Sequence, residues 1–334
     1  MEVSVVMPVF NAAATIEDAV QSIRQQTFRD WELIVIDDGS TDGTPDILAD
    51  CAELDRRVQP VFTQHFGIVS ALTTGVELGR GEFIARMDAD DISHPDRFAE
   101  QLSFLGQHVD MGLVGSLVEF GGDRATSEGY ALHVDWMNTI ATPQQIALNR
   151  FIESPFAHPS VMFRRELIAR YGGYRQGSFP EDYELWLRWM SAGVKMSKVP
   201  HTLLRWNDAS ERLSRKDLRY STDAFYRCKA NYLATWLQAN VASNRPIIVW
   251  GVGRPTRKRA DYLLEHRVDI RAYIDIDPEK QGRSLSERPV LSPSEIPGDA
   301  FVLVYVANRG ARELIRAQLQ SLGRIEGQDF LMAA

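Results

Sequence analysis

The chain of 334 residues is 44% hydrophobic and 25% charged, and its formal net charge is −8 at pH 7. Length alone predicts about two domains, because a single core stops growing near this size. The acidic balance argues against a general nucleic-acid-binding protein, since such proteins need excess Lys and Arg to neutralise phosphates. We therefore expect no nucleic-acid partner.

Two further features concern the cellular compartment. The cysteines, Cys51 and Cys228, are too few for a disulfide framework and are predicted to be reduced. No run of about 20 apolar residues is present to span a bilayer, and the opening stretch MEVSVVMPVF is acidic rather than basic, unlike a signal peptide. We expect a cytoplasmic protein, and peripheral contact with the inner face of the membrane stays open.

Strands and helices alternate through the first ninety residues. The β-branched run VSVVMPV predicts a strand buried on both faces, and apolar residues at helical spacing follow it up to Gln26. Further strands are predicted at 31–37, 58–63 and 82–88, and helices at 45–54 and 68–78. This alternation predicts an α/β fold with a mainly parallel sheet flanked by helices.

After about residue 96 the alternation weakens. The pattern predicts a helix at 97–107, a strand at 111–120, an irregular stretch, a helix at 143–151 and a largely buried helix from Glu181. Residues 215–240 predict one long amphipathic helix, after which Ser243–Pro246 break the chain.

The tail restarts an α/β pattern. Strands are predicted at 247–253, 271–277 and 301–308, and helices at 256–266 and 309–323. We therefore divide the chain into a first domain at 1–214, a connecting helix at 215–244 and a small Rossmann-like α/β domain at 245–334. Gly251 and Gly253 follow a strand, but Thr256 occupies the third position of the dinucleotide-binding pattern, which weakens that reading.

Acidic clusters follow two of the predicted strands. Asp88 and Asp90 project to the same side if the backbone stays extended, and such a pair suits Mg²⁺ or Mn²⁺ bridging to a diphosphate. In VIDDGSTD, Asp38 could accept hydrogen bonds from a nucleobase or ribose while Asp37 orients the turn. Each cluster also has a purely structural reading, as a solvated loop or an Asx turn. Arg86 could reach a nucleotide or pair with a core acid.

Several motifs in order resemble glycosyltransferase family 2. They are MPVFN, QSIRQQTFRDWELIVIDDGSTDGT, GEFIARMDADDISHPDRFAEQLSFL, HPSVMFRRE, GGY and EDYELWLRW, and the resemblance covers roughly residues 2–210. It implies the GT-A nucleotide-diphospho-sugar transferase fold. It also implies inverting, metal-dependent transfer of a sugar from a nucleotide-diphosphate donor, with UDP expected, to a hydroxyl of a saccharide or other acceptor, in polysaccharide or glycoconjugate synthesis.

The resemblance also assigns roles. It implies that Pro8 and Asn11 line the nucleoside pocket, that Asp38 contacts uracil, that Asp88 lies near the ribose, and that Asp90 binds Mn²⁺ or Mg²⁺. Arg86 is taken as a nucleotide-side residue, whereas Asp91 is expected to cap the next turn.

Asp182 matches the catalytic base of the family. Inverting transfer requires the acceptor hydroxyl to lose its proton as it attacks the anomeric carbon. The alternative is that Glu181 and Asp182 are acidic residues in the first turn of a helix, where the helix dipole favours negative charge.

Some positions depart from the family or stay open. Gln64 and His65 replace the usual base-reading cation, and Thr73 stands where Asn is usual, which leaves the nucleobase preference open. His158 is a buried histidine or an acceptor contact, and the segment ERLSR at 211–215 closes over the diphosphate or caps the next helix. The alternative functions are a nucleotidyltransferase and a non-catalytic nucleotide-sugar-binding protein.

Overall fold

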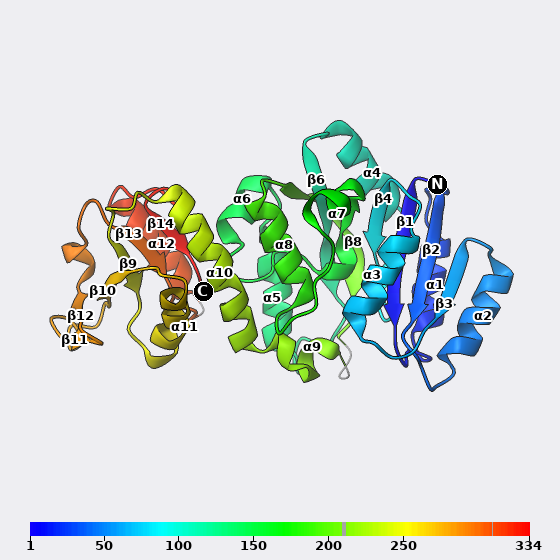
Figure 1. The fold of residues 1–334 in the computed structure, drawn as a ribbon, viewed down its shortest axis with the longest axis horizontal. Helices are drawn as coiled ribbons and strands as arrows, with labels where there is room; N and C mark the ends of the chain where they lie inside the picture. Colours follow the sequence, from blue (N-terminus) through cyan, green and yellow to red (C-terminus); the bar gives the residue numbers. More distant parts are fainter. Residues whose placement is uncertain (209–211, 309) are drawn as a thin grey trace. The chain divides into compact units, whose positions relative to one another are not determined.

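The computed structural model describes residues 1–208, 212–308 and 310–334 (Figure 1). The chain forms two compact units. The first comprises Met1–Ile146, Pro155–Gly177 and Glu181–Lys216, and the second comprises Ala147–Ser154, Ser178–Pro180 and Asp217–Ala334. The domain boundaries inferred from the sequence, at 214 and 244, stay predictions.

The first unit is built on an eight-stranded sheet in the order β3-β2-β1-β4-β7-β6-β8-β5. Neighbours are parallel from β3 to β4 and between β6 and β8, whereas β7 is antiparallel to β4 and β6, and β5 to β8. The predicted, mainly parallel α/β fold is thus confirmed. The strands are β1 (Val3–Val9), β2 (Trp31–Asp37), β3 (Val58–Phe62), β4 (Phe83–Arg86), β5 (Ile92–Ser93), β6 (Met111–Phe120), β7 (Met162–Arg164) and β8 (Lys195–Trp206).

Helices cover both faces of this sheet because its central strands alternate between two apolar cores. In β1, Val3, Val5 and Met7 pack with residues of α1, whereas Val6 packs with Leu72 of α3. The helices of the first unit are α1 (Ile16–Arg24), α2 (Thr44–Leu54), α3 (Ile68–Leu78), α4 (Arg97–Gln107), α5 (Glu128–Thr139), α7 (Glu166–Tyr171), α8 (Glu181–Ser191) and α9 (Leu213–Lys216), and α6 (Pro143–Asn149) runs across the division between the units.

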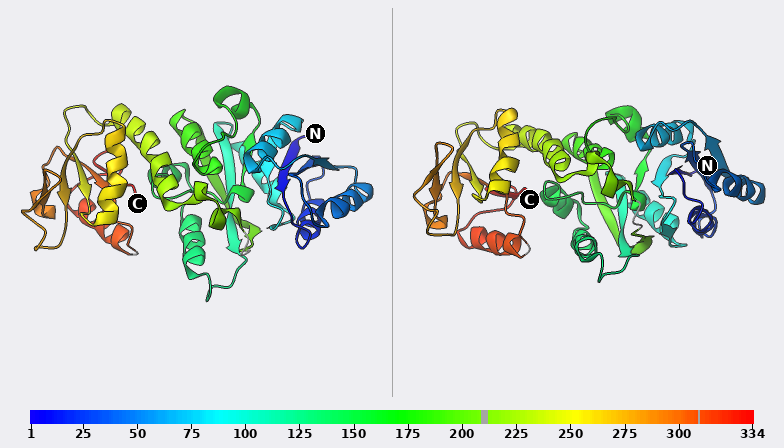
Figure 2. Two further views of the ribbon diagram at one scale, coloured as in Figure 1. Left: turned by 60° about the horizontal axis from the view of Figure 1, so that its bottom comes forward. Right: turned by 90° about the horizontal axis from the view of Figure 1, so that it is seen from below.

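The second unit has its own six-stranded sheet, in the order β11-β12-β10-β9-β13-β14. Its strands are parallel except β11, and α11 and α12 lie on opposite sides of them (Figure 2). The elements are α10 (Thr222–Asn240), β9 (Ile247–Trp250), α11 (Arg254–Glu265), β10 (Ile270–Ile274), β11 (Ser284–Leu285), β12 (Arg288–Leu291), β13 (Phe301–Val304), α12 (Ala311–Ser321) and β14 (Phe330–Met332).

Two secondary-structure predictions were wrong. The long helix expected at 215–240 is interrupted, because the Asp217 carboxylate accepts the N–H of Arg219 and the Ser221 hydroxyl accepts the N–H of Ala224, at the N-cap of α10. Short polar side chains of this kind start a new helix by competing for backbone donors. The stretch after residue 120, expected to be irregular, contains α5.

Packing of α3 on the sheet yields a test of the fold. A Cβ at Gly75 would lie 2.4 Å from Cγ1 of Val6, a stiff β-branched side chain, whereas a Cβ at Gly106 in α4 would meet no atom within 4 Å. We expect Gly75→Ala to lower the free energy of unfolding by about 1–3 kcal/mol through overpacking. Gly106→Ala should raise it by about 0.5–1 kcal/mol through helix propensity. Urea unfolding measures the free energy of unfolding of both variants. Equal changes in that free energy for Gly75→Ala and Gly106→Ala would contradict the tight contact between α3 and Val6.

Candidate active site

The loops after β1 and β2 are tied together at the carboxyl edge of the first sheet. Asn11 adopts a left-handed backbone conformation with φ of 50°. Its side-chain oxygen accepts the N–H of Thr41 at 2.8 Å, and its own N–H donates to the Ser40 hydroxyl at 2.8 Å. Pro8 lies in β1, opposite Ile36 of β2. Asn11 therefore fixes the shape of this edge, and its predicted nucleoside contact stays a prediction.

Asp37 and Asp38 both hold backbone in place. Asp37 accepts the N–H of Ser40 at 3.0 Å, as the sequence reading expected. The buried Asp38 carboxylate accepts the N–H groups of Phe66 and Gly67, each at 2.8 Å, and lies 2.9 Å from Nδ1 of His65. The loop after β3 is therefore fastened to the end of β2 by one carboxylate.

An aromatic face at this edge was missed in the sequence. The Phe10 ring stacks on His65 with a centroid distance of 4.2 Å, and both side chains are about half exposed or more. His65 had been noted only as a departure from the usual cation. A flat, exposed pair of rings offers a surface on which a nucleobase can stack.

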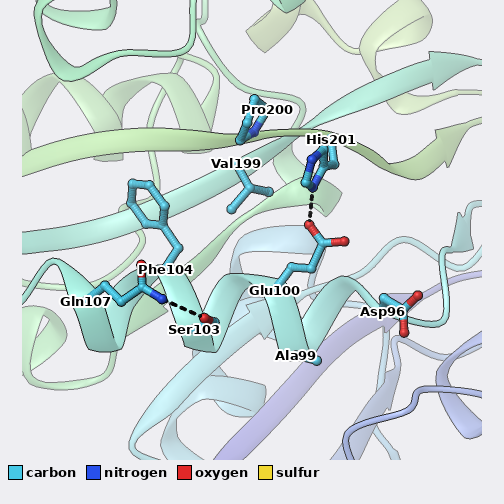
Figure 3. Close-up of a pocket in the computed structure, with 9 residues that line it drawn as sticks. All are labelled: Asp96, Ala99, Glu100, Ser103, Phe104, Gln107, Val199, Pro200 and His201. Carbon is cyan, nitrogen blue, oxygen red and sulfur yellow. Dashed lines mark hydrogen bonds and ion pairs between the residues drawn. The ribbon is translucent and has the colours of Figure 1, made fainter.

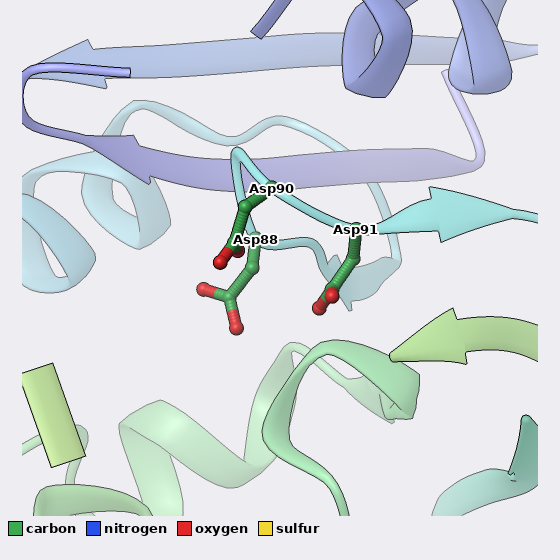
Figure 4. A group of neighbouring side chains, drawn as sticks. All are labelled: Asp88, Asp90 and Asp91. Atoms are coloured by element: carbon green, nitrogen blue, oxygen red, sulfur yellow. The ribbon is translucent and has the colours of Figure 1, made fainter. Parts of the chain in front are cut away.

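Three carboxylates converge after β4. Oxygens of Asp88, Asp90 and Asp91 lie within 4.8 Å of one another (Figure 4). The sequence predicted that Asp88 and Asp90 share one side because the strand stays extended through them, and this was wrong. Strand β4 ends at Arg86. The acids meet because residues 88–91 form a turn in which the Asp91 N–H donates to the Asp88 carbonyl. Asp91 does not cap the next turn; its Oδ1 accepts the N–H of Asn207 at 2.8 Å.

The electrostatics of this turn suit a divalent cation. Burial and the charge of Asp88 raise the pKa of Asp90 to about 6, and burial and the same neighbour raise that of Asp91 well above its usual value. Oδ2 of Asp91 is buried and, within the described residues, has no hydrogen-bond partner. The three carboxylates cannot easily all be ionised at once unless a positive charge lies between them. Mg²⁺ or Mn²⁺ would supply that charge, and both ions favour carboxylate ligands.

Two buried arginines lie beneath the acidic turn. Arg86 is 1% exposed, and its guanidinium contacts the Asp88 carboxylate at 2.7 Å, so it pairs with an acid of the site. Arg97 donates to the carbonyls of Arg86 at 2.9 Å and Pro159 at 2.8 Å, and burial lowers its pKa to about 9. Arg97 was not identified in the sequence, where it reads as an ordinary helix residue.

Arg212 faces the same acids from the segment after β8. Its guanidinium lies over the rings of Trp206 at 4.4 Å and Tyr130 at 5.1 Å, within electrostatic reach of Asp88, Asp90 and Asp91. Nη1 of Arg212 is buried and has no partner among the described residues. In the ERLSR segment, Arg215 pairs with Asp208 at 2.6 Å, and Glu211 lies outside the described residues.

Asp182 lies in the first turn of α8, and its Oδ1 accepts the N–H of Tyr183 at 2.7 Å. Burial and the charge of Glu181 raise its pKa to about 7, and the positive charge of Arg86 opposes this shift. Arg86 thus acts electrostatically on both Asp88 and Asp182. His158 is buried, and its Nε2 lies 2.8 Å from the Tyr174 hydroxyl, in agreement with a structural histidine.

An open groove elsewhere on the first unit contains none of the predicted site residues (Figure 3). It lies between α4 and β8, where His201 contacts Glu100 at 2.5 Å. Its lining is formed by Asp96, Ala99, Glu100, Ser103, Phe104, Gln107, Val199, Pro200 and His201. The chemistry-bearing groups therefore gather at the carboxyl edge of the sheet rather than in this groove.

Comparison with known proteins identifies the family of the chain. Residues 4–172 match the sequence family described as Glycosyl transferase family 2. The O-antigen biosynthesis glycosyltransferase WbnJ of Escherichia coli is 31% identical over 251 residues, which cover 72% of this chain and 91% of WbnJ. The chain belongs to glycosyltransferase family 2, so the resemblance noted in the sequence is confirmed.

Two more matches add detail. The UDP-Gal:alpha-D-GlcNAc-diphosphoundecaprenol beta-1,3-galactosyltransferase of Escherichia coli is 27% identical over 69% of this chain and 85% of its own length. The structure of mannosyltransferase PcManGT from Pyrobaculum calidifontis, in complex with GDP-Man and Mn²⁺, matches with a TM-score of 0.50 at 23% identity. That match covers 71% of this chain and 64% of the mannosyltransferase chain, and it supports the fold.

Two further findings do not concern the glycosyltransferase match. Residues 243–328 match the family described as C2185-like, N-terminal. Among the described residues, no helix combines the length and apolar character needed to cross a bilayer.

The environment of Asp182 gives a pH prediction. Since folding raises its pKa from an ordinary 3.8 to about 7, ionising Asp182 destabilises the fold as pH rises between these values. We expect Asp182→Asn to raise the melting temperature at pH 8 but not at pH 4. In ¹³C NMR of labelled aspartate, the Asp182 carboxyl should titrate near pH 7, and Glu181→Gln should lower that midpoint. A midpoint near 4 would contradict the burial of this carboxyl.

Proposed function

We propose that this protein is an inverting, metal-dependent glycosyltransferase that moves a sugar from a nucleotide-diphosphate donor to an acceptor hydroxyl in polysaccharide or glycoconjugate synthesis. One observation carries the proposal. Three carboxylates that could hold a metal ion converge after β4, and Arg86, which pairs with Asp88 of that group, also acts on the buried Asp182 carboxyl of raised pKa.

The acidic turn would hold the metal and the donor diphosphate. Asp90 is the proposed ligand of Mn²⁺ or Mg²⁺, and Asp91, whose Oδ2 has no hydrogen-bond partner among the described residues, offers a further oxygen donor in the same group. When bound, the ion stabilises the negative charge of the departing diphosphate. Arg212 adds a positive charge within electrostatic reach of the three acids, and a phosphate oxygen would accept its buried Nη1–H.

The loops after β1 and β2 would bind the nucleoside. Pro8, Asn11 and Asp38 form this wall, and the Phe10–His65 pair is the proposed stacking surface for the base. We propose UDP as the nucleotide, in line with the UDP-galactose donor named for one relative. Because backbone N–H groups already occupy both oxygens of Asp38, a uracil N–H would use a remaining lone pair.

Asp182 is the proposed base. A carboxylate with a pKa of about 7 is partly ionised at neutral pH and is a stronger base than an ordinary aspartate, so it can accept the acceptor's hydroxyl proton. As that oxygen bonds to the anomeric carbon, the bond to the diphosphate breaks on the opposite face. The diphosphate leaves with the bonding electron pair, and the anomeric configuration inverts.

Two substitutions separate binding from catalysis. Asp182→Asn keeps the size of the side chain but removes its basicity, so we expect transfer to fall about 10²–10⁴-fold while donor binding persists. Asp90→Asn should instead weaken Mn²⁺ and UDP binding together. Isothermal titration calorimetry measures binding, and release of nucleoside diphosphate from a panel of nucleotide sugars measures turnover.

The exposed Asp110, which pairs with Lys195 on the surface of the first unit, provides a matched control. Asp110→Asn should leave both binding and turnover unchanged. Full turnover by Asp182→Asn would remove Asp182 as the base. In a separate assay, release of pyrophosphate from a nucleoside triphosphate and a sugar 1-phosphate, with formation of the nucleotide sugar, would identify a nucleotidyltransferase.

A further inference from the structure

Helix α5 brings an aromatic side chain to the end of β8. Its Val134 and Met137 are buried in the core of the first unit. The side chain of Asn138 accepts the N–H of Val118 in β6 at 3.1 Å and donates to the carbonyl of the same residue at 2.8 Å. Tyr130 precedes Val134 by four residues and Met137 by seven, so the three side chains share one face of the helix. The contacts that fix α5 on β6 therefore also fix the position of Tyr130.

Tyr130 and Trp206 form two sides of an aromatic corner. Their ring centroids lie 5.4 Å apart, with an angle of 57° between the ring planes. Phe120, the last residue of β6, packs against Tyr130 with a centroid distance of 6.5 Å. The guanidinium carbon of Arg212 lies 4.4 Å from the Trp206 centroid and 5.1 Å from the Tyr130 centroid. Both rings therefore attract the positive charge of Arg212 through their π faces.

This stacking leaves the N–H edge of the guanidinium for another partner. A planar guanidinium can stack on rings through its faces while its N–H groups donate in its own plane. Nη1 of Arg212 is buried and has no hydrogen-bond partner among the described residues. Asp88, Asp90 and Asp91 act on Arg212 electrostatically. The corner thus holds a cation close to the acidic turn with one buried donor still available.

The neighbouring arginine shows the contrast. The guanidinium carbon of Arg215 lies 5.8 Å from the same Tyr130 centroid, but Nη2 of Arg215 donates to both carboxylate oxygens of Asp208 at 2.6 Å. Two arginines therefore approach one ring, and the carboxylate partner belongs to Arg215. The free donor of Arg212 indicates that this side chain serves a group other than a neighbouring acid.

We propose that Tyr130 is a positioning residue for the donor diphosphate: together with Trp206 it holds Arg212 so that the free Nη1–H meets a diphosphate oxygen. This inference rests on the proposed function, in which Arg212 contacts the diphosphate. Tyr130 itself acts through Arg212 and does not touch the donor. The proposal gives α5, a helix that the sequence did not predict, a part in donor binding.

The benefit of the aromatic corner is preorganisation. An arginine side chain has many rotamers, and fixing it costs conformational entropy. When the rings fix Arg212 before the donor arrives, less of that cost falls on the binding step. Removing the Tyr130 ring should therefore reduce the affinity for a nucleoside diphosphate, and it should do so only while Arg212 is present.

The test measures UDP binding to the full-length protein by calorimetry in the presence of Mn²⁺. Tyr130→Leu removes the ring and should weaken UDP binding about 3- to 10-fold. Tyr130→Met removes the ring with an unbranched side chain and replaces the leucine variant if thermal melting shows that the latter does not fold. Tyr130→Phe keeps the ring and should bind UDP as the parent does. In an Arg212→Met protein, Tyr130→Leu should cause no further loss.

The double variant separates positioning from a purely structural role. If the ring only supported the fold, its loss would weaken UDP binding equally with and without Arg212, and that result would overturn the proposal. Unchanged UDP binding by a folded Tyr130→Leu protein, or a loss with Tyr130→Phe as large as with Tyr130→Leu, would also overturn it.

A surface substitution on the same helix provides the control. Arg124→Met removes an exposed arginine that pairs with Asp135 of α5 at 2.7 Å, and it should leave UDP affinity unchanged because exposed ion pairs contribute little. Failure of the parent protein to bind UDP would contradict the proposed function, and this inference with it. Parent binding with no effect of the Tyr130 ring would contradict this inference alone.

Discussion

The structure of the catalytic unit depends on holding Asp88, Asp90 and Asp91 together against their mutual repulsion. The turn is fixed from three sides: Arg86 pairs with Asp88, Arg97 binds the backbone beneath, and Asn207 donates to Asp91 and, through its side chain, to the Asp90 carbonyl. These contacts hold the acids in place. They do not remove the repulsion and burial that raise the pKa of Asp90, and they provide no hydrogen-bond donor to Oδ2 of Asp91 among the described residues. A bound cation would stabilise such an arrangement.

Arg86 also links the acidic turn to Asp182. A buried arginine that paired only with Asp88 would be a local salt bridge. Arg86, however, also opposes the raised pKa of Asp182. A metal ion bound to the acidic turn would neutralise its negative charge. The positive charge of Arg86 would then act more strongly on Asp182 and favour its ionised form. The two carboxylate centres are thereby coupled through one side chain, so under the proposed function donor binding and activation of the base would not be independent events.

Much of this could be predicted from the sequence, because parallel strands bring polar residues at their carboxyl ends to one edge. The runs VSVVMPV and WELIVID predicted β1 and β2, and hence the grouping of Asn11, Asp38 and the residues after β4. Contacts between residues far apart in the sequence could not be predicted. Arg97 reads as an ordinary residue of an amphipathic helix, and Phe10 with His65 meet only when the loops after β1 and β3 are folded. Asp217 and Ser221 broke a helix that periodicity extended through them, because capping is a local competition that periodicity does not register.

Stability alone does not explain the acidic turn of the first unit. Replacing buried charged groups with apolar residues is often neutral or favourable for stability, yet ligand oxygens of Asp88, Asp90 and Asp91 lie within 4.8 Å of one another. Burial and mutual repulsion raise the pKa of both Asp90 and Asp91 in the free protein. A bound cation would offset both the burial and the repulsion of these carboxylates. The converging acids are therefore better explained by the proposed metal and diphosphate than by folding.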